Sequence, residues 1–281
     1  MILRIFLITT FALSASAQRT PDPDHWDKSS VRIEVPFLET APKIDGDLGD
    51  WKYLAFTDGL WDIFRVAASP WYDPARNRLT NHRHEPAPED DLNARYYSAW
   101  DHQYLYLGAE VRDNVNDVSD PQHEASRWYF KDAICWFIEA PHHAEPDSFG
   151  KGDNAFCFVA DARKPSYGAW WRHGTPLDHY VEEPIPRRSV NYVLRMNPWR
   201  RSRGDFILEA RVEMASTLGK SDPDWKPPHV GDRYGIEIVH TDPDGGAYGG
   251  HLIIYGTGDN DATWAIMTLA GPKTPIERKP E

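Results

Sequence analysis

The sequence predicts an all-β fold: an antiparallel, jelly-roll-like β-sandwich with short helical turns and one long inserted loop. Three observations support this fold class. Apolar and polar residues alternate in short runs from residue 31 onward, which is the period of a half-buried strand. Asn, Asp, Gly and Pro separate the runs and mark turns. Helical periodicity is almost absent, so two packed sheets are expected.

About ten runs are strand candidates, and turn residues bound each of them. They occupy residues 30–37, 94–100, 104–111, 132–140, 154–162, 166–174, 189–196, 206–214, 234–242 and 251–258. Two further segments, 47–54 and 213–220, predict short helical turns, because each offers residues that can cap a helix. No repeat at propeller or solenoid spacing is visible, which argues against those architectures.

The sandwich is predicted to cover residues 31–271. Residues 59–92 interrupt it as a long polar loop that carries several prolines. A loop of that length in a compact domain is usually functional or disordered. The segments on either side, residues 18–30 and 272–281, are predicted to be a flexible leader and a flexible tail.

Residues 1–17 have the pattern of a secretory signal peptide. Arg4 precedes an apolar run, and the small residues Ala15 and Ala17 are placed for cleavage near Ala17. The run is too short for a membrane anchor, and no later run reaches the length of a membrane span. We therefore expect a secreted protein, periplasmic or extracellular, without a membrane anchor.

Charge and aromatic content narrow the class of partner. The formal net charge is −12, which argues against nucleic acid, because nucleic-acid binding depends on clustered cations. The chain has 12 tryptophans in 281 residues, and such a surplus is typical of proteins that pack the flat C–H face of a pyranose on an indole. An oligosaccharide or polysaccharide is the partner that this composition favours.

The two cysteines, Cys135 and Cys157, lie in predicted strands. After export they can form one disulfide. Free buried thiols are equally ordinary in apolar strands, so both alternatives stay open at this point.

The segment IDGDLGDW, residues 44–51, packs three aspartates between glycines and ends in Trp51. Asp-Gly pairs form tight turns, and Asp47 or Asp50 can cap a short helix, so we interpret the segment as architecture, with Trp51 plugging one end of the sandwich. The alternative is an acid/base pair. A glycosidase needs two carboxylates facing each other across a cleft, and nothing near this segment predicts one.

A cluster of oxygen ligands follows the predicted strand 104–111. Asp113, Asn116, Asp117 and Asp120 offer the hard ligands that suit calcium, although their spacing is not that of the twelve-residue calcium loop. A solvated acidic loop is the alternative. Calcium is the cofactor that these residues suggest, and weaker acidic groups occur at Asp242, Asp244, Asp259 and Asp261.

Signatures of catalysis are missing. The chain has no GxSxG elbow, no HExxH motif and no phosphate-binding glycine loop, so no catalytic residue is assigned. The histidine pairs His82/His84 and His142/His143 lie in proline-rich acidic loops, where solvated histidine is commoner than a zinc or copper site.

The order of several short motifs resembles the family 9 carbohydrate-binding modules, a secreted β-sandwich family that binds sugars without cleaving them. The matching segments cover most of residues 31–271 and read APKIDGDLGDW, YYSAWDHQYLYLGAEVRDN, SRWYFKDAICWFIEA, FILEARVEMASTL, YGIEIVHTDPDGG and GDNDATWAIMTLAG. Each motif is weak alone, and the assignment rests on their order.

The resemblance implies a site in which two tryptophans clamp one sugar ring, and Trp128 and Trp264 occupy the matching positions. Both rings are then expected at a solvent-exposed rim. Hydroxyls at the sugar edge need polar partners, and Lys131, Asp132 and Asn260 lie close in sequence to the two rings. Some relatives place an arginine where this chain has Cys157, so their preference for the reducing end is not carried over.

Other tryptophans divide between core and surface. Trp170 and Trp171 are adjacent, so on a strand they point to opposite faces, and we count Trp171 among the ligand-binding residues. Trp100 and Trp136 are expected in the core, because large aromatics in strand motifs usually fill sandwiches.

The sequence therefore predicts a secreted, non-catalytic carbohydrate-binding protein that supports carbohydrate catabolism. A glycoside hydrolase, or an accessory subunit of one, is the alternative, motivated by the loop 59–92 and its acids. A haem-binding redox sandwich is a third hypothesis, for which Met196, Met214 and Met267 are available as ligands. The identity of the sugar and the oligomeric state are not determined by the sequence.

Overall fold

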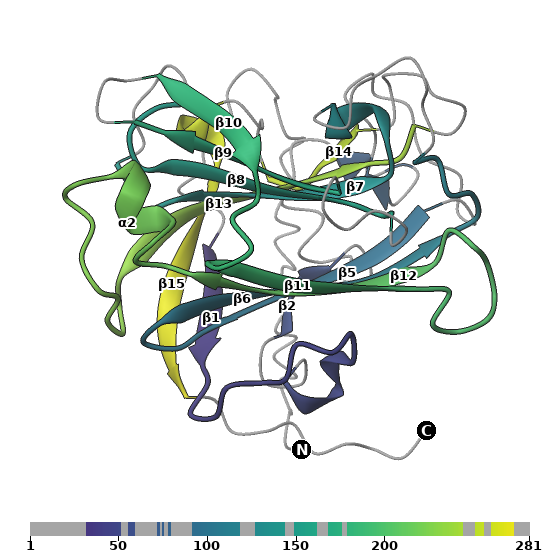
Figure 1. Cartoon of the computed structure of the whole chain (residues 1–281), viewed down its shortest axis with the longest axis horizontal. Coiled ribbons are helices and arrows are strands. Elements are labelled where there is room, and N and C mark those ends of the chain that lie inside the picture. Colours follow the sequence, from purple (N-terminus) through teal and green to yellow (C-terminus); the bar gives the residue numbers. More distant parts are fainter. Residues whose placement is uncertain are drawn as a thin grey trace, which may run out of the picture.

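Two layers of β-strands face each other across a buried core (Figure 1). The computed structural model describes residues 32–51, 56–59, 72–73, 75, 78–79, 92–118, 127–143, 149–161, 168–175, 179–243, 251–255 and 260–272. The predicted signal peptide and leader, and nearly all of the predicted tail, lie outside the described residues. Among the described residues, no helix is long and apolar enough to cross a membrane.

The strands follow one hydrogen-bonded order from edge to edge. The upper layer in Figure 1 contains β10 (Tyr180–Pro184), β9 (Ala169–Gly174), β8 (Asp153–Val159), β7 (Ala133–Glu139) and β13 (Arg233–Thr241), with β14 (His251–Ile253) paired to β13. β15 (Ala265–Pro272) and β1 (Arg32–Phe37) connect the layers. The lower layer contains β5 (Leu92–Trp100), β6 (Tyr104–Asp113), β12 (Phe206–Glu213) and β11 (Val190–Met196), with β2 (Phe56–Gly59) beside β5.

The predicted all-β sandwich is confirmed, with two differences in detail. The layers belong to one 13-stranded sheet that folds over itself, and β1 runs parallel to both β15 and β5. No hairpin turn links β1 to either neighbour, so no turn imposes an antiparallel direction. The second difference is that β2 and β10 were not among the expected strands. Both faces of β10 are largely exposed, and its residues therefore do not alternate.

Short helical segments agree with the expected positions. The turn η3 (Leu48–Asp50) falls inside the first predicted segment, and α2 (Leu218–Ser221) overlaps the second and ends one residue beyond it. Two more, η4 (Trp128–Phe130) and η5 (Asp261–Thr263), precede β7 and β15. Within the predicted insertion 59–92, the structure describes a small hairpin of β3 (Tyr72–Asp73) and β4 (Arg78–Leu79).

Large aromatic side chains fill the space between the layers. Tyr96 of the lower layer meets Trp136 of the upper layer with ring centroids 6.3 Å apart. Trp100 and Trp136 are both 0% exposed, which confirms their predicted place in the core. The Tyr96 hydroxyl lies 2.6 Å from Nδ1 of His240, and burial lowers the pKa of His240 to about 3, so this imidazole is neutral at ordinary pH.

The segment IDGDLGDW covers the outer face of the lower layer. Trp51 packs on that face, where a Cβ at Gly108 would lie 3.0 Å from the indole ring. The Asp47 carboxylate accepts the backbone N–H of Gly49 and caps η3. The interpretation of this segment as structural is therefore confirmed. Trp51 covers a sheet face rather than plugging one end of the sandwich, because the segment runs beneath β6 and β12.

Candidate ligand-binding face and acidic cluster

The outer face of the upper layer points away from the other layer. The pairing register places Cys135, Cys157 and Trp170 in one row across β7, β8 and β9. Phe137 and Arg172 belong to the next row, which continues to Glu182 of β10. Because side chains alternate along a strand, all of these residues share the outer face.

The two cysteines of this row form a disulfide. Cys135 and Cys157 are directly opposite each other on β7 and β8, and they are 0% and 1% exposed. This pairing decides between the two alternatives that the sequence left open, and it ties β7 to β8 beneath the outer face.

Trp264 lies over this face but not at a solvent-exposed rim. Its ring contacts Phe137 at 5.6 Å and Phe149 at 6.5 Å between centroids, and it is 0% exposed. The expectation of an open indole is wrong here, because aromatic neighbours on the sheet take the contacts that a sugar was expected to make.

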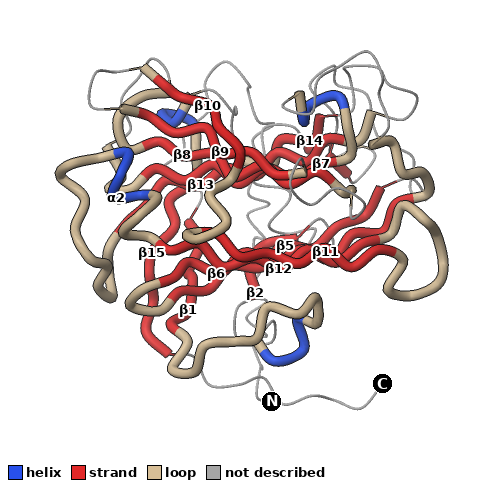
Figure 2. Tube along the Cα trace, in the orientation of Figure 1, coloured by secondary structure: helices blue, strands red, loops and turns tan. Residues whose placement is uncertain are grey.

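Trp128 is also buried, with 6% of its surface exposed, and its ring contacts Tyr129. The segment η4 packs against β8 and β13, where the carbonyl of Lys131 accepts the Thr241 hydroxyl. Short helical segments lie at opposite ends of the upper layer (Figure 2).

The strand register shows how far apart along β7 the segments that carry Trp128 and Trp264 are packed. Thr241, which bonds the chain after η4, pairs with Ala133, whereas Trp264 packs on Phe137. These two positions on β7 are about 13 Å apart at the usual rise of a strand. The predicted pair of exposed plates is therefore corrected to two buried indoles that are attached at separate places on the layer.

Trp171 points inward, toward the other layer. Its ring stacks on Phe156 at 6.2 Å, its indole N–H donates to Asn154 at 3.0 Å, and Lys220 Nζ lies 4.8 Å from the ring centroid. The residue is 1% exposed. The sequence counted Trp171 among the ligand-binding residues, whereas the register places its side chain on the inner face and that of Trp170 on the outer face. Sequence alone does not fix which of two neighbours faces outward.

The remaining predicted sugar contacts have structural partners. The Asn260 side chain accepts the backbone N–H of Ala262 at 3.1 Å and caps η5. Lys131 is 7% exposed. Asp132 is 1% exposed and belongs to an acidic cluster on the way from η4 into β7.

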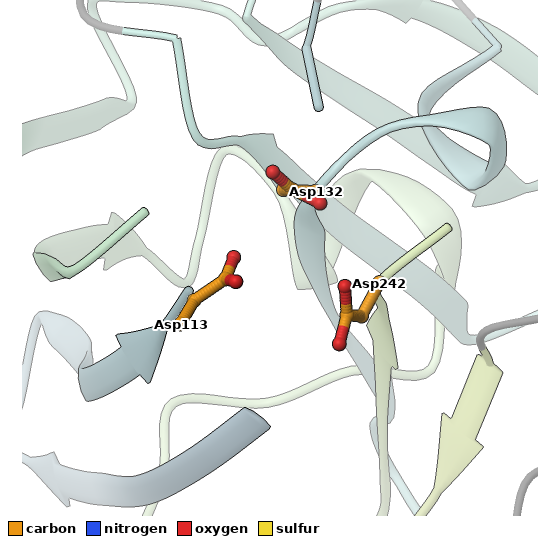
Figure 3. A group of neighbouring side chains, drawn as sticks. All are labelled: Asp113, Asp132 and Asp242. Atoms are coloured by element: carbon orange, nitrogen blue, oxygen red, sulfur yellow. The ribbon is translucent and has the colours of Figure 1, made fainter. Parts of the chain in front are cut away.

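This acidic cluster consists of Asp113, Asp132 and Asp242, whose carboxylates converge in Figure 3. Asp113 ends β6, Asp132 precedes β7 and Asp242 follows β13. One oxygen from each residue lies within 4.8 Å of the others. Asp113 and Asp132 are each 1% exposed and Asp242 is 8% exposed, so three carboxylates from both layers meet almost out of solvent.

Electrostatics in the cluster are unfavourable without a cation. Burial raises the pKa of Asp132 to about 9, the charge of Asp113 adds to this, and the backbone N–H of Asp117 opposes it. The Asp132 Oδ2 accepts hydrogen bonds from that N–H and, at 3.5 Å, from the Asn116 amide. Oδ1 of Asp132 is buried and has no hydrogen-bond partner among the described residues.

The donor set fits calcium, which takes carboxylate oxygens in a flexible geometry. Asp113, Asn116 and Asp117, three of the predicted calcium ligands, lie in or beside the cluster, whereas Asp120 lies outside the described residues. Asp132 was assigned to the sugar and Asp242 was judged a weak signal. Strand ends could have revealed the grouping, since each of the three acids adjoins the end of a strand.

Comparison with known proteins gives a consistent result. A family model described as "Carbohydrate family 9 binding domain-like" matches residues 66–265. Two solved structures of a family 9 carbohydrate-binding module from Caldicellulosiruptor kristjanssonii, in complex with cellotriose and with glucose, each have a TM-score of 0.55 and 16% identity and cover 88% of this chain and 100% of their own. At that identity the likeness concerns the fold. No curated protein matches the chain.

Proposed function

The chain belongs to the carbohydrate family 9 binding domain-like family, and we propose that it is a secreted protein that holds an oligosaccharide on the outer face of its upper layer. Family membership supports a non-catalytic, sugar-binding function. The family match over residues 66–265 is the observation that carries the proposal. Secretion is motivated by the signal-peptide pattern of residues 1–17.

The chemistry of the outer face suits a sugar. Aromatic rings gather there around Trp264, and the charged residues Arg172 and Glu182 stand in the neighbouring strands. A pyranose presents an apolar C–H face to a ring and hydroxyls to charged partners. A protein that binds without cleaving would support polysaccharide catabolism by keeping oligosaccharides close to other, catalytic proteins.

The tryptophan clamp is the finer part of this proposal. Trp128 and Trp264 are the rings that the family resemblance assigns to the ligand, and both are buried. A clamp between them therefore requires that binding opens both indoles. The binding of cellotriose should then weaken when either ring is removed. Acrylamide quenching of tryptophan fluorescence should also change when the sugar is added.

Calorimetric titration of the purified protein tests the function. Glucose, cellotriose and xylotriose are the probes, and at least one is expected to bind. Binding that survives unchanged in folded Trp128→Ala and Trp264→Ala variants would reject the clamp but leave sugar binding intact. Absence of heat with all sugars, or release of reducing sugar from them, would contradict the non-catalytic binding function.

A calcium ion held by Asp113, Asp132 and Asp242 is a second part of the proposal. Three nearly buried carboxylates within 4.8 Å support it, and Oδ1 of Asp132 has no hydrogen-bond partner in the part of the chain that the structure describes. A bound cation would neutralise them and tie the start of β7 to the ends of β6 and β13. Metal analysis of the purified protein and its unfolding temperature with and without chelator test this part.

A further inference from the structure

We propose that the edge of the upper layer carries a second contact for a neutral oligosaccharide, formed by the ring of Tyr180 and the ion pair of Arg172 and Glu182. This inference rests on the proposed sugar-binding function and extends it. It assigns the surface that would contact the next sugar along a chain whose first unit lies near Trp264.

Tyr180 is an aromatic ring that the fold leaves open. It begins β10, the edge strand of the layer, and it is 50% exposed. Few large apolar side chains among the described residues reach that exposure. The Arg172 guanidinium lies over the ring, and the half of the side chain that stays exposed offers an apolar surface, a platform on which a flat sugar face can pack.

A charged pair stands directly beside this ring. Arg172 is opposite Glu182 in the register, and both Nε and Nη2 of the guanidinium lie 3.3 Å from Oε1 of Glu182. The guanidinium carbon lies 4.8 Å from the centroid of Tyr180. The carboxylate therefore holds the guanidinium at a set orientation next to the platform, and the two groups together supply N–H donors and carboxylate acceptors.

The platform is continuous with the face described above. Phe149 lies between the two regions: its centroid is 6.0 Å from Tyr180 and 6.5 Å from Trp264. Only one ring therefore separates the buried indole from the exposed tyrosine. A single sugar cannot use both positions, whereas an oligosaccharide can, so this surface is expected to recognise chain length.

The charge of the pair indicates the class of sugar. Arg172 and Glu182 neutralise each other, so the platform offers no net charge to attract an acidic sugar. Donors and acceptors side by side suit hydroxyl groups, which can accept from one and donate to the other. A neutral gluco- or xylo-oligosaccharide fits this arrangement better than an oligosaccharide of uronic acids.

The other layer offers a matched control. Trp199 is 39% exposed and has the guanidinium of Arg112 5.5 Å from its ring. It therefore reproduces an exposed ring beside an arginine, but it lies in the turn between β11 and β12, away from the outer face of the upper layer. Trp199→Ala should leave sugar binding unchanged.

Calorimetry with glucose, cellotriose and tri-galacturonic acid tests the inference on wild type, Tyr180→Ala, Tyr180→Phe and Trp199→Ala. Tyr180→Ala is expected to weaken the binding of cellotriose about 10-fold, which corresponds to the loss of one stacking contact. The affinity for glucose should change little. Tyr180→Phe keeps the ring and should bind like the wild type. Thermal unfolding confirms that each variant is folded.

The possible outcomes distinguish failure of the second contact from failure of the proposed function. Equal cellotriose affinity in folded Tyr180→Ala and wild type would overturn the second contact and leave the proposed function standing. Tighter binding of tri-galacturonic acid than of cellotriose would overturn the neutral class of ligand. A wild type that binds none of the sugars would contradict the proposed function itself, and the second contact with it.

Discussion

Glu209 on β12 and Asp132 before β7 are both acids buried in the sandwich, yet their surroundings differ. Glu209 accepts the backbone N–H groups of Asp45 and Gly46 at 2.8 and 2.7 Å and the Trp51 indole N–H at 2.9 Å. Asp132 lies among other carboxylates, and one of its buried oxygens has no hydrogen-bond partner within the described ranges of the chain.

Burial raises the pKa of both groups, but the neighbouring groups act on the two pKa values in opposite directions. Three N–H donors lower the pKa of Glu209 against that burial, whereas neighbouring acids add to the rise at Asp132. Glu209 thus fastens the segment 45–51 to the sheet, and its charge is satisfied within the fold. Burial alone therefore does not distinguish the two acids; the hydrogen-bond donors at Glu209 and the like charges at Asp132 do.

The largest effect is expected at Glu209. Glu209→Ala leaves three N–H donors without their acceptor, two of them buried and one partly buried, and should lower the free energy of unfolding by about 3 to 5 kcal/mol. Urea denaturation measures it. Glu213→Ala, the same change on the same strand near solvent, is the control and should cost about 1 kcal/mol or less. Equal losses in both variants would contradict the fastening role of Glu209.

The opposite result is expected at Asp132. Calcium at about 100 times its dissociation constant should stabilise the wild type by about 3 kcal/mol, and Asp132→Asn should abolish most of that gain. In chelator, the same variant should be as stable as the wild type or more so, because on folding the wild type must either take up a proton at Asp132 or bury a third carboxylate charge, whereas an amide requires neither. A calcium-independent unfolding temperature in the wild type would argue against the cation.

The pH dependence of stability sharpens the comparison further. The folded pKa of Asp132 is about 9, and an unfolded aspartate titrates at about 4. Between these values the folded protein keeps a proton that the unfolded chain releases, so the stability from this group is complete below about pH 4 and is lost as pH rises toward 9.

Unfolding in chelator at about pH 5 and about pH 8 measures this slope. Other groups also titrate in this range, so the quantity to compare is the difference in unfolding free energy between wild type and Asp132→Asn. The wild type should lose stability relative to the variant as pH rises. Saturating calcium should flatten the difference in slope if the ion holds the charged carboxylate. A difference that does not vary with pH would contradict the raised pKa of Asp132.

The smallest effect is expected at Asp47, an exposed acid in the same segment that Glu209 holds. Asp47→Ala removes the cap on η3 and should cost about 1 kcal/mol of unfolding free energy. Asp47→Asn retains an acceptor oxygen and should recover most of it. A loss as large as that of Glu209→Ala would mean that the cap, rather than the buried acid, holds the segment.

Local patterns predicted much of this fold. Alternation located most of the strands and the core positions of Trp100 and Trp136, because side chains on one strand face opposite sides at every step. The same rule could not decide between Trp170 and Trp171, since a shift of one residue exchanges the two faces. The edge strand β10 was not predicted, because most of its side chains are exposed and its sequence shows no alternation of apolar and polar residues.

The candidate sites were less accessible from sequence. Motif order pointed to Trp128 and Trp264, but both are buried, and the rings that pack on Trp264, Phe137 and Phe149, come from other segments of the chain. Asp113 was selected from a local run of acids, whereas its partners Asp132 and Asp242 belong to other parts of the chain. No local spacing records that three strand ends meet.

The sequence by itself determined the period of the strands, the turns between them and the capped entry segment, because these depend on neighbours within a few residues. Only the tertiary structure decided which acids converge, which tryptophan of an adjacent pair faces outward and that Cys135 bonds to Cys157. Those features depend on strand register and on how the sheet folds over, which bring together residues that are remote along the chain.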